Sequence, residues 1–166
     1  MKIKKNSGFT LIEIIIAVTI IAIISVTGIT YYGRETAKAR ANSDLYNAKQ
    51  VGLGLYRAYI DGSSSMGTSI ITSADITAGN TFNANDKPID GSAGGLGERL
   101  VNNKYLEDAR VFTIQGRKGW KMAYSLTDRG LVSVYVYNPA NIGEYVTLYP
   151  AVSENPLAPY NMVSNK

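Results

Sequence analysis

Two residue types are missing from this sequence of 166 residues: it has no cysteine and no histidine. The first absence excludes disulfide bonds and thiol nucleophiles. The second removes the commonest general base and the commonest metal ligand. Acids do occur near one another, as in Glu107-Asp108 and in Asp86 with Asp90, but acids in a polar loop are typical of a solvated surface. We therefore expect no enzyme, no catalytic residues, no cofactor and no metal site.

Charge is also missing from one long stretch, Ile14 to Gly33, in which isoleucine, valine, alanine and threonine dominate. The stretch is long enough to cross a bilayer as a helix. A secretory signal peptide is a poor match, because its apolar core has about 7 to 15 residues and is followed by its cleavage site. Here the apolar run from Phe9 to Tyr32 is longer and includes Glu13, and Gly8 lies before it. A plain membrane anchor explains the length but gives Glu13 no role.

The formal net charge of +4 and the pI near 9.2 come mostly from the first eight residues. Lys2, Lys4 and Lys5 lie there, whereas from Gly62 onward the chain has nine basic and nine acidic residues. This later part is formally neutral, which argues against a nucleic-acid partner. Lysines beside a membrane span tend to remain cytoplasmic, so they predict an N-terminus on the inner side.

The six residues Gly8-Phe9-Thr10-Leu11-Ile12-Glu13 open the apolar run and place a glycine, an aromatic residue and an acid in a fixed order. A carboxylate at the centre of a membrane helix costs about 2.5 to 3.5 kcal/mol on insertion scales, so Glu13 needs a cationic partner or a place near the interface. This order resembles the class III signal peptide and N-terminal helix of type IV pilins and the related pseudopilins. The resemblance implies that a prepilin peptidase removes residues 1–8 and that Phe9 is then N-methylated. It also implies that Glu13 meets the N-terminal amine of a neighbouring subunit during assembly.

The resemblance further implies a structural subunit of a bacterial type IV pilus, which forms a homo-oligomeric helical filament. The precursor would sit in the inner membrane with its N-terminus inside, meet the pilus assembly platform, and end in an extracellular filament at the cell surface. A pseudopilin of a type II secretion system, and a minor pilin that serves in adhesion or DNA binding, remain as alternatives. So does an anchored domain that never polymerises. Motility, adhesion, secretion and DNA uptake share this subunit design.

After the apolar run the chain is predicted to continue as the same helix to about Asp61. Residues 34–60 are amphipathic, because apolar or small side chains recur at spacings of three and four and predict one buried face. These residues are Ala41, Leu45, Ala48, Gly52, Leu55 and Tyr59, while the rest of the helix surface carries Arg34, Lys38, Arg40, Asp44, Lys49 and Arg57. The first half of such a helix would pack against copies of itself, and the second half against the chain's own sheet.

One segment of the predicted helix is locally weak. Gly28 costs about 1 kcal/mol relative to alanine, and the β-branched Thr27, Ile29 and Thr30 around it are also poor helix formers. The helix could melt here on assembly, or Gly28 could let two membrane helices approach closely. Both interpretations stay open.

The rest of the chain predicts a sheet packed on the long helix, which gives an α+β fold like the ladle shape of pilins. Residues 61–97 are interpreted as a variable loop with a short strand at 68–72, and residues 98–106 as a short helix. From Phe112 the apolar period is two, which predicts an antiparallel meander within 110–149. Its strands are expected near residues 112–114, 120–127, 132–137 and 145–149, with turns at 116–119, 127–130 and 138–139. Prolines in the tail after Pro150 exclude a central strand, so the tail would be held by Leu157, Tyr160 and Met162.

One predicted turn carries a candidate partner surface, formed by Arg117, Lys118, Trp120 and Lys121. Positive charge next to an aromatic ring suits single-stranded nucleic acid. In a formally neutral domain, however, such residues are more often an ordinary hairpin tip. The predicted organisation is therefore a leader at 1–8, a membrane and filament-core segment at 9–32, and an extracytoplasmic head at 33–166 that includes helix 33–61.

Overall fold

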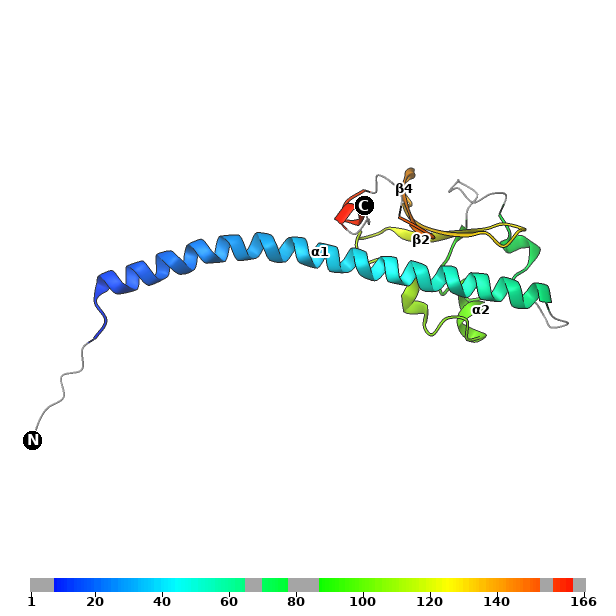
Figure 1. The fold of residues 1–166 in the computed structure, drawn as a ribbon, viewed down its shortest axis with the longest axis horizontal. Coiled ribbons are helices and arrows are strands. Elements are labelled where there is room, and N and C mark those ends of the chain that lie inside the picture. The colour runs from blue at the N-terminus through cyan, green and yellow to red at the C-terminus, as the bar shows by residue number, and fades with distance from the viewer. Residues whose placement is uncertain (1–7, 65–69, 78–86, 153–156, 163–166) are drawn as a thin grey trace, which may run out of the picture. The chain divides into compact units, whose positions relative to one another are not determined.

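The computed structural model describes residues 8–64, 70–77, 87–152 and 157–162. It has the predicted α+β fold, with one long helix followed by an antiparallel sheet (Figure 1). The elements in chain order are α1 (Leu11–Ser64), η1 (Ser73–Asp75), β1 (Lys87–Pro88), α2 (Leu96–Asn102), η2 (Ala109–Phe112), β2 (Lys121–Leu126), β3 (Val132–Asn138), β4 (Asn141–Tyr149) and η3 (Tyr160–Met162). The chain divides into two units, Met1–Thr36 and Ala37–Lys166, and each is described by itself.

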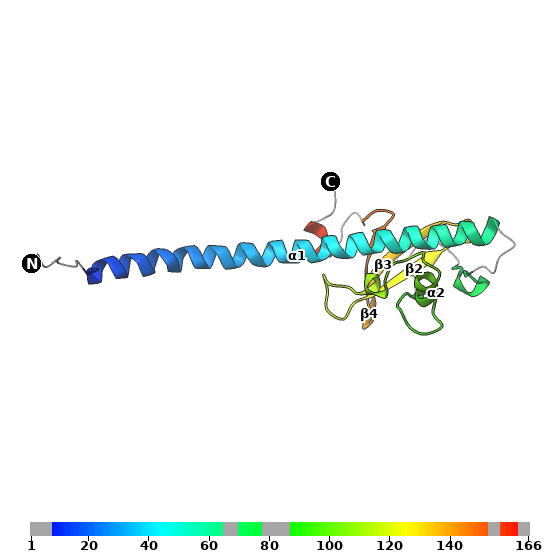
Figure 2. The same cartoon turned by 90° about the horizontal axis from the view of Figure 1, so that it is seen from below.

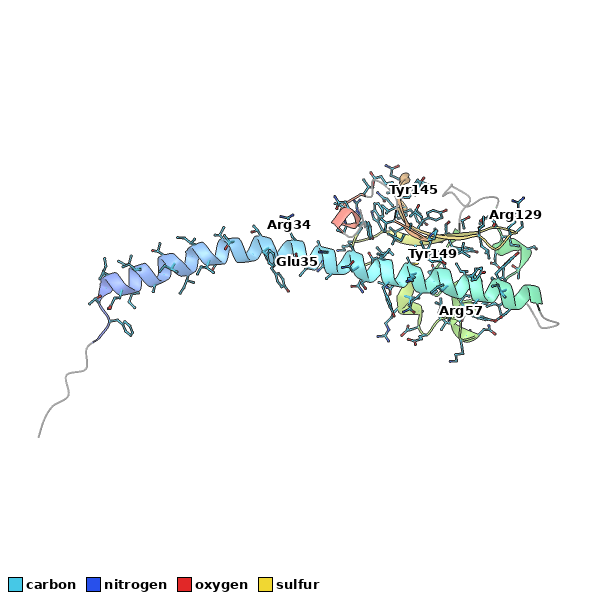
Figure 3. All side chains as sticks on the ribbon, in the orientation of Figure 1. Arg34, Glu35, Arg57, Arg129, Tyr145 and Tyr149 are labelled. Carbon is cyan, nitrogen blue, oxygen red and sulfur yellow. The ribbon has the colours of Figure 1, made fainter. Side chains whose placement is uncertain are left out.

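In the first unit, the described residues form the start of α1 and leave their apolar side chains exposed on every side (Figure 3). The helix continues without interruption through Gly28. Hydroxyl groups within it donate to backbone carbonyls of the preceding turn: Thr19 to Ile15 at 2.8 Å, Ser25 to Ile21 at 2.7 Å and Thr27 to Ile24 at 2.9 Å. Such bonds satisfy these polar groups within the helix, so they add little cost in a lipid environment.

The second unit, the head, contains the second half of α1 and has a hydrophobic core of its own, because all core residues lie between Ala41 and Tyr160. The buried face of α1 follows spacings of three and four, as predicted for an amphipathic helix. It comprises Ala41, Asp44, Ala48, Val51, Leu55 and Ala58. The prediction was wrong about Asp44, which it placed on the charged surface. Its position between Ala41 and Ala48 puts Asp44 on the buried face.

The sheet has four antiparallel strands in the order β1-β2-β3-β4, and β2, β3 and α2 lie beside the second half of α1 (Figure 2). The predicted turn at 127–130 joins β2 to β3. Gly130 has a φ of +76°, a conformation that favours glycine, and its N–H donates to the carbonyl of Thr127 at 3.0 Å. The turn between β3 and β4 follows Asn138, whose side-chain oxygen accepts from the N–H of Ala140 at 3.0 Å. Strands β2, β3 and β4 therefore confirm the predicted meander.

The predicted strand at 112–114 was wrong. Residues 109–112 form the 3₁₀ turn η2, because the Asp108 side chain accepts the N–H of Arg110 at 2.9 Å and so caps this turn. Residues 116–119 consequently precede β2 and do not join two strands. The predicted short strand at 68–72 falls partly outside the described residues, and its described part, residues 70–72, is not a strand. The fourth strand is instead β1, inside the segment predicted as a loop.

Both faces of β2 and β3 are buried, although the alternating pattern predicted one buried face. Met122, Tyr124 and Leu126 belong to the core shared with α1, while Ala123 and Ser125 point to the opposite face and are also buried. The segment before β1 contacts this opposite side. Thr77 donates its backbone N–H to the carbonyl of Leu126 at 2.7 Å and shares a hydrogen bond of 2.8 Å with the Ser125 hydroxyl. A small polar residue in a strand was therefore not a reliable sign of exposure.

Candidate processing and assembly site

The N-terminal motif lies at the open start of α1. Gly8 and Phe9 precede the helix, and the Phe9 side chain is 85% exposed. A Cβ atom built at Gly8 would meet no other atom within 4 Å. The packing of this chain therefore does not require glycine at position 8. The lysines of the leader lie outside the described residues.

Thr10 and Glu13 form a capping box at this helix start. The Glu13 Oε2 atom accepts the Thr10 backbone N–H and the Thr10 hydroxyl, both at 2.8 Å. In return, the Glu13 N–H lies 3.4 Å from the Thr10 Oγ1 atom. Reciprocal bonds of this kind satisfy N–H groups that a helix start leaves without partners inside the helix. A negative charge in the first turn is also favoured by the helix dipole.

This arrangement gives Glu13 a partner within its own chain. The sequence indicated it through Thr10-x-x-Glu13 before an apolar run, which is the signature of a capping box. Sequence reasoning assigned Glu13 to assembly and missed Thr10. The assembly role of Glu13 stays a prediction. The capping box is compatible with it, because the second carboxylate oxygen and the negative charge of Glu13 are still available to a neighbouring subunit.

The apolar surface that follows the motif is large and uncovered. Among the described residues, one helix is long and apolar enough to cross a membrane. Its most exposed side chains include Leu11, Ile12, Ile21, Ile23, Ile24, Val26 and Ile29. Adding a Cβ at Gly28 would meet no atom within 4 Å, so the chain's own packing does not explain this glycine either.

A second cluster lies in the head, around the carboxylate of Asp44, which is fully buried. Its Oδ1 atom accepts the N–H of Gln115 at 2.8 Å, and its Oδ2 atom accepts the N–H of Gly116 at 2.7 Å and the Tyr160 hydroxyl at 2.8 Å. We call these four residues the Asp44 clamp. It joins α1, the segment before β2 and the C-terminal tail, three parts of the chain that are far apart in sequence.

The clamp also explains two features of its members. A Cβ at Gly116 would lie 2.8 Å from Asp44 Oδ2 and 3.1 Å from the Tyr160 hydroxyl oxygen, so only glycine fits there without a shift. Burial raises the pKa of Tyr160, and the nearby Asp44 carboxylate adds to the effect because it would repel a phenolate. Tyr160 is buried and bonds to Asp44, so it holds the tail on α1, as predicted. Leu157 is 39% exposed, and the side chain of Met162 lies outside the described part.

Burial raises the pKa of Asp44 above the usual range of an aspartate, and this effect outweighs the three donated hydrogen bonds. The folded state therefore favours the protonated carboxyl more than the unfolded state does. The stabilisation from this titration is fully present below the unfolded pKa and is lost as the pH rises through the folded pKa. Acidification is thus not expected to release the clamp by titrating Asp44.

The candidate partner surface at residues 117–121 is partly used within the head. The Arg117 guanidinium carbon lies 4.3 Å from the centre of the Trp120 ring, in a cation–π contact. The Arg117 Nε–H also donates to the carbonyl of Ala158 at 2.6 Å. Lys118 and Lys121 are exposed. The four residues are close together in the chain, but Arg117 is directed to the Trp120 ring and to the tail.

Carboxylates do not gather into a metal site in the part of the chain that the structure describes, where no group of three or more His, Cys, Asp or Glu residues could hold an ion. Glu107 is exposed, and Asp108 forms an ion pair of 2.6 Å with Arg110. Asp90 accepts the Ser92 hydroxyl and, at 3.0 Å, the Ser92 N–H, and these two bonds hold its pKa low. Asp86 lies outside the described residues.

Comparison with known proteins connects the first site to a known family motif. A model of the prokaryotic N-terminal methylation motif matches residues 3–29. The chain carries the class III signal peptide of type IV pilins over these residues. No curated protein and no solved structure matched the chain. The motif supports a type IV pilin-like or pseudopilin protein with a membrane-anchored precursor, and it points to a structural protein and not to an enzyme.

Proposed function

We propose that this chain is a structural subunit of a type IV pilus, cut between Gly8 and Phe9 and assembled through its N-terminal helix. The observation that carries the proposal is the methylation motif at the start of an apolar half-helix that the described residues do not cover. Lipid can cover this surface before assembly, and neighbouring copies can cover it in a filament. A pseudopilin would share both features, so secretion is the alternative use of the same subunit design.

The open geometry at the cleavage site supports the first step. A peptidase must reach the bond between Gly8 and Phe9, and both residues are exposed. Since a side chain at position 8 would have free space within this chain, the need for glycine is attributed to the enzyme that cuts after it. Cleavage would leave Phe9 as the new N-terminus, directly before the Thr10–Glu13 capping box. The amine of Phe9 would then be N-methylated.

The energetics of the apolar half-helix support the second step. Moving one isoleucine side chain out of water is worth about 1.5 to 3 kcal/mol, so this surface is strongly unfavourable in water. In lipid the same surface has no such cost, and association there depends on packing between helices. The subunit is therefore expected to pass directly from the membrane into the filament, without a soluble intermediate, at an assembly platform in the inner membrane.

The proposed orientation, with the N-terminus inside and the head outside, rests on the leader. Lys2, Lys4 and Lys5 precede the span, but cations also follow it at Arg34, Lys38 and Arg40. Because positive residues flank both ends, their number alone does not set the orientation. The proposal therefore depends on the resemblance of residues 1–8 to prepilin leaders.

Two substitutions at Glu13 test the assembly role and separate it from capping. Glu13→Gln keeps an acceptor oxygen for Thr10 but removes the charge, whereas Glu13→Ala removes both. If the charge pairs with a cation on the next subunit, both variants will be processed normally but will lower the yield of sheared filaments by at least about tenfold, which corresponds to ~1.4 kcal/mol. Glu35→Gln, an exposed acid of the same helix, is the control and should assemble normally. Normal assembly of Glu13→Gln would show that capping is sufficient and would contradict the pairing.

A further inference from the structure

Tyrosines lie next to each other on the face of the sheet that points away from α1. Tyr145 precedes Val146, a core residue of β4, and neighbouring residues of a strand point to opposite faces. Tyr145 therefore points away from the core and from α1, as Figure 3 shows, and it is 40% exposed. Its cross-strand partner on β3 is Tyr137, which is half-buried. The two tyrosines therefore form an aromatic surface on this face.

A buried tyrosine holds the Tyr145 ring in place. Tyr135, two residues before Tyr137 on β3, is 1% exposed, and its ring contacts that of Tyr145 edge to face. The ring centres are 6.1 Å apart and the ring planes meet at 81°, which is a favourable geometry for two aromatic rings. A ring held in this way loses little conformational freedom when a ligand binds. Tyr145 is therefore suited to offer one ring face to a ligand.

Two opposite charges continue this surface across the sheet. Lys121 on β2 is the cross-strand partner of Tyr137. Asp90 follows Ile89, a core residue bonded to β2, and so points to the opposite face. Burial raises the pKa of Tyr137, and the Asp90 carboxylate adds to this effect, as expected of groups that lie close together. Both Lys121 and Asp90 are exposed. We call Asp90, Lys121, Tyr137 and Tyr145 the tyrosine row, which is about 14 Å long because it crosses three gaps between adjacent strands.

The chemistry of the tyrosine row restricts what can bind to it. One carboxylate and one ammonium group cancel, so the row has no net charge to attract a nucleic acid or another polyanion. The row also has a hydrogen-bond acceptor and a donor beside its rings. Both Ser92 bonds of Asp90 end on its Oδ1 atom, so Oδ2 can accept further bonds, and the Lys121 ammonium is a donor. A sugar ring matches this combination, because it has an apolar C–H face and hydroxyl groups at its edge.

We propose that the tyrosine row binds a neutral oligosaccharide. The C–H face of one sugar packs on the Tyr145 ring, and the following sugars extend over Tyr137 towards Lys121 and Asp90, which bond to their hydroxyl groups. The length of the row accounts for an oligosaccharide instead of a single sugar. This site goes beyond the proposed function, because it concerns a ligand of the head and not the assembly of subunits. Its binding can be measured on separate subunits, so the test does not depend on whether filaments form.

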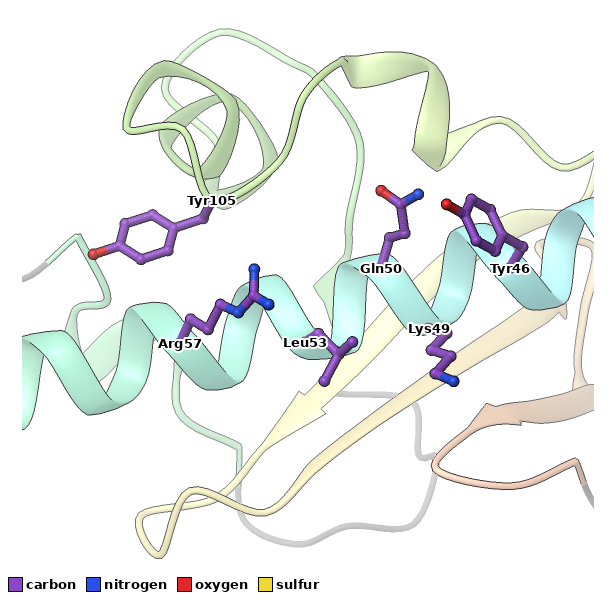
Figure 4. A pocket seen from close by; sticks show the side chains of 6 residues that line it. All are labelled: Tyr46, Lys49, Gln50, Leu53, Arg57 and Tyr105. Atoms are coloured by element: carbon purple, nitrogen blue, oxygen red, sulfur yellow. The ribbon is translucent and has the colours of Figure 1, made fainter.

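Another exposed tyrosine of the head provides a matched control. Tyr46, which is 64% exposed, lines a groove of about 310 Å³ beside α1 (Figure 4). The other residues that line the groove are Lys49, Gln50, Leu53, Arg57 and Tyr105. These six described residues supply aromatic rings and two cations but no carboxylate. The groove therefore has the rings of the tyrosine row without its charge balance, and a ligand that needed only an exposed ring would bind at both places.

Isothermal titration of the full chain, kept in a detergent without a sugar head group, tests the site. The neutral probes are chitotriose, cellotriose and maltotriose, and a heparin-derived tetrasaccharide is the anionic probe. At least one neutral probe should bind. Tyr145→Ala should weaken its binding by at least about tenfold, which corresponds to ~1.4 kcal/mol, while Tyr145→Phe keeps the ring and should retain most of the affinity.

Two further variants separate binding at the row from a loss of folding. Lys121→Ala changes an exposed side chain and should weaken binding while the unfolding temperature stays at the wild-type value. Tyr46→Ala should bind like the wild type. The inference is wrong if no neutral probe binds, if Tyr145→Ala and Lys121→Ala bind as tightly as the wild type, or if Tyr46→Ala weakens binding as much as Tyr145→Ala. Preferred binding of the heparin tetrasaccharide would indicate a site for polyanions and would also overturn it.

Discussion

At the scale of single residues, two of the acids on α1 have opposite surroundings. Glu13 lies at an exposed helix start and accepts two hydrogen bonds from Thr10, whereas Asp44 lies in the core and accepts three from distant parts of the chain. A buried carboxylate is costly unless each oxygen has donors. Asp44 meets this condition, and it does so by tying the C-terminal tail to the helix. In a chain without disulfides, the clamp supplies a cross-connection of the kind that a disulfide provides elsewhere.

Tyr160→Phe tests the clamp. The variant leaves Asp44 Oδ2 with the Gly116 N–H alone, so the head should lose about 1 to 3 kcal/mol of unfolding free energy near pH 7. Urea unfolding of the head, residues 37–166, measures this loss. The core of this unit is contained within those residues, so it can be studied without the apolar half-helix.

The loss of stability in the same variant should depend on pH. The folded state keeps the Tyr160 proton, because its pKa is raised, while the unfolded state releases it above about pH 10. The stabilisation from Tyr160 should therefore be constant up to the unfolded pKa and then decrease by at most about 1.4 kcal/mol per pH unit. Subtracting the unfolding free energy of Tyr160→Phe from that of the wild type at each pH removes the contribution of other titrating groups. A difference that stays constant to pH 11 would argue against a buried, protonated Tyr160.

At the scale of elements, α1 is one helix with two different surfaces. Its first half is apolar all around, while its second half has a buried face of small residues that lets the sheet approach closely. Gly52 shows this most clearly, because a Cβ there would lie 2.5 Å from Cδ1 of Tyr149 on β4. Glycine inside a helix is unfavourable by propensity, so its presence at position 52 is explained by packing.

Gly52→Ala makes this explanation testable. Alanine improves helix propensity by about 1 kcal/mol, but overpacking in a core costs about 1 to 3 kcal/mol. We expect a net loss of stability in the head, measured by thermal or urea unfolding. Gly143→Ala on β4 is the matched control, because its Cβ would make only an ordinary contact of 3.4 Å with Asn141 Oδ1. A stabilised Gly52→Ala variant would mean that the helix and Tyr149 do not approach as described.

The elements that could be predicted from sequence are those with a strong period or turn chemistry. The long helix followed from its apolar run and its spacing of three and four, and β2 and β3 from alternation around the turn that ends in Gly130. The residues of β1 could not be found, because a strand of two residues, one of them Pro88, has no period. η2 was mistaken for a strand because Phe112 and Ile114 alternate, while the deciding interaction is the local cap by Asp108.

Of the two sites, the N-terminal motif could be predicted from the sequence and the Asp44 clamp could not. The order of Gly8, Phe9 and Glu13 carried the family motif, and Thr10-x-x-Glu13 contained the capping box, which sequence reasoning overlooked. The Asp44 clamp could not be predicted, since its donors lie more than 70 residues away in sequence and two of them are backbone N–H groups. Burial of a charged residue depends on such partners, and residue type alone indicates exposure.

At the scale of the whole molecule, the chain has two parts with different surfaces. The segment before the head carries the motif and an apolar surface that has to be covered by lipid or by other copies. The head carries its own core, and its described residues form no cluster of metal ligands. Such a division suits a subunit whose N-terminal part assembles and whose head is displayed. In the proposed function, cutting after Gly8 would remove the leader lysines and leave Phe9 as the N-terminus.

The most direct test of this account is the intact mass and N-terminal sequence of the native protein, recovered from sheared filaments of cells that express it. The account predicts a chain that begins at N-methylated Phe9, lacks residues 1–8 and is the main component of the filaments. A membrane-bound chain that still begins at Met1, in cells with an active prepilin peptidase, would contradict it.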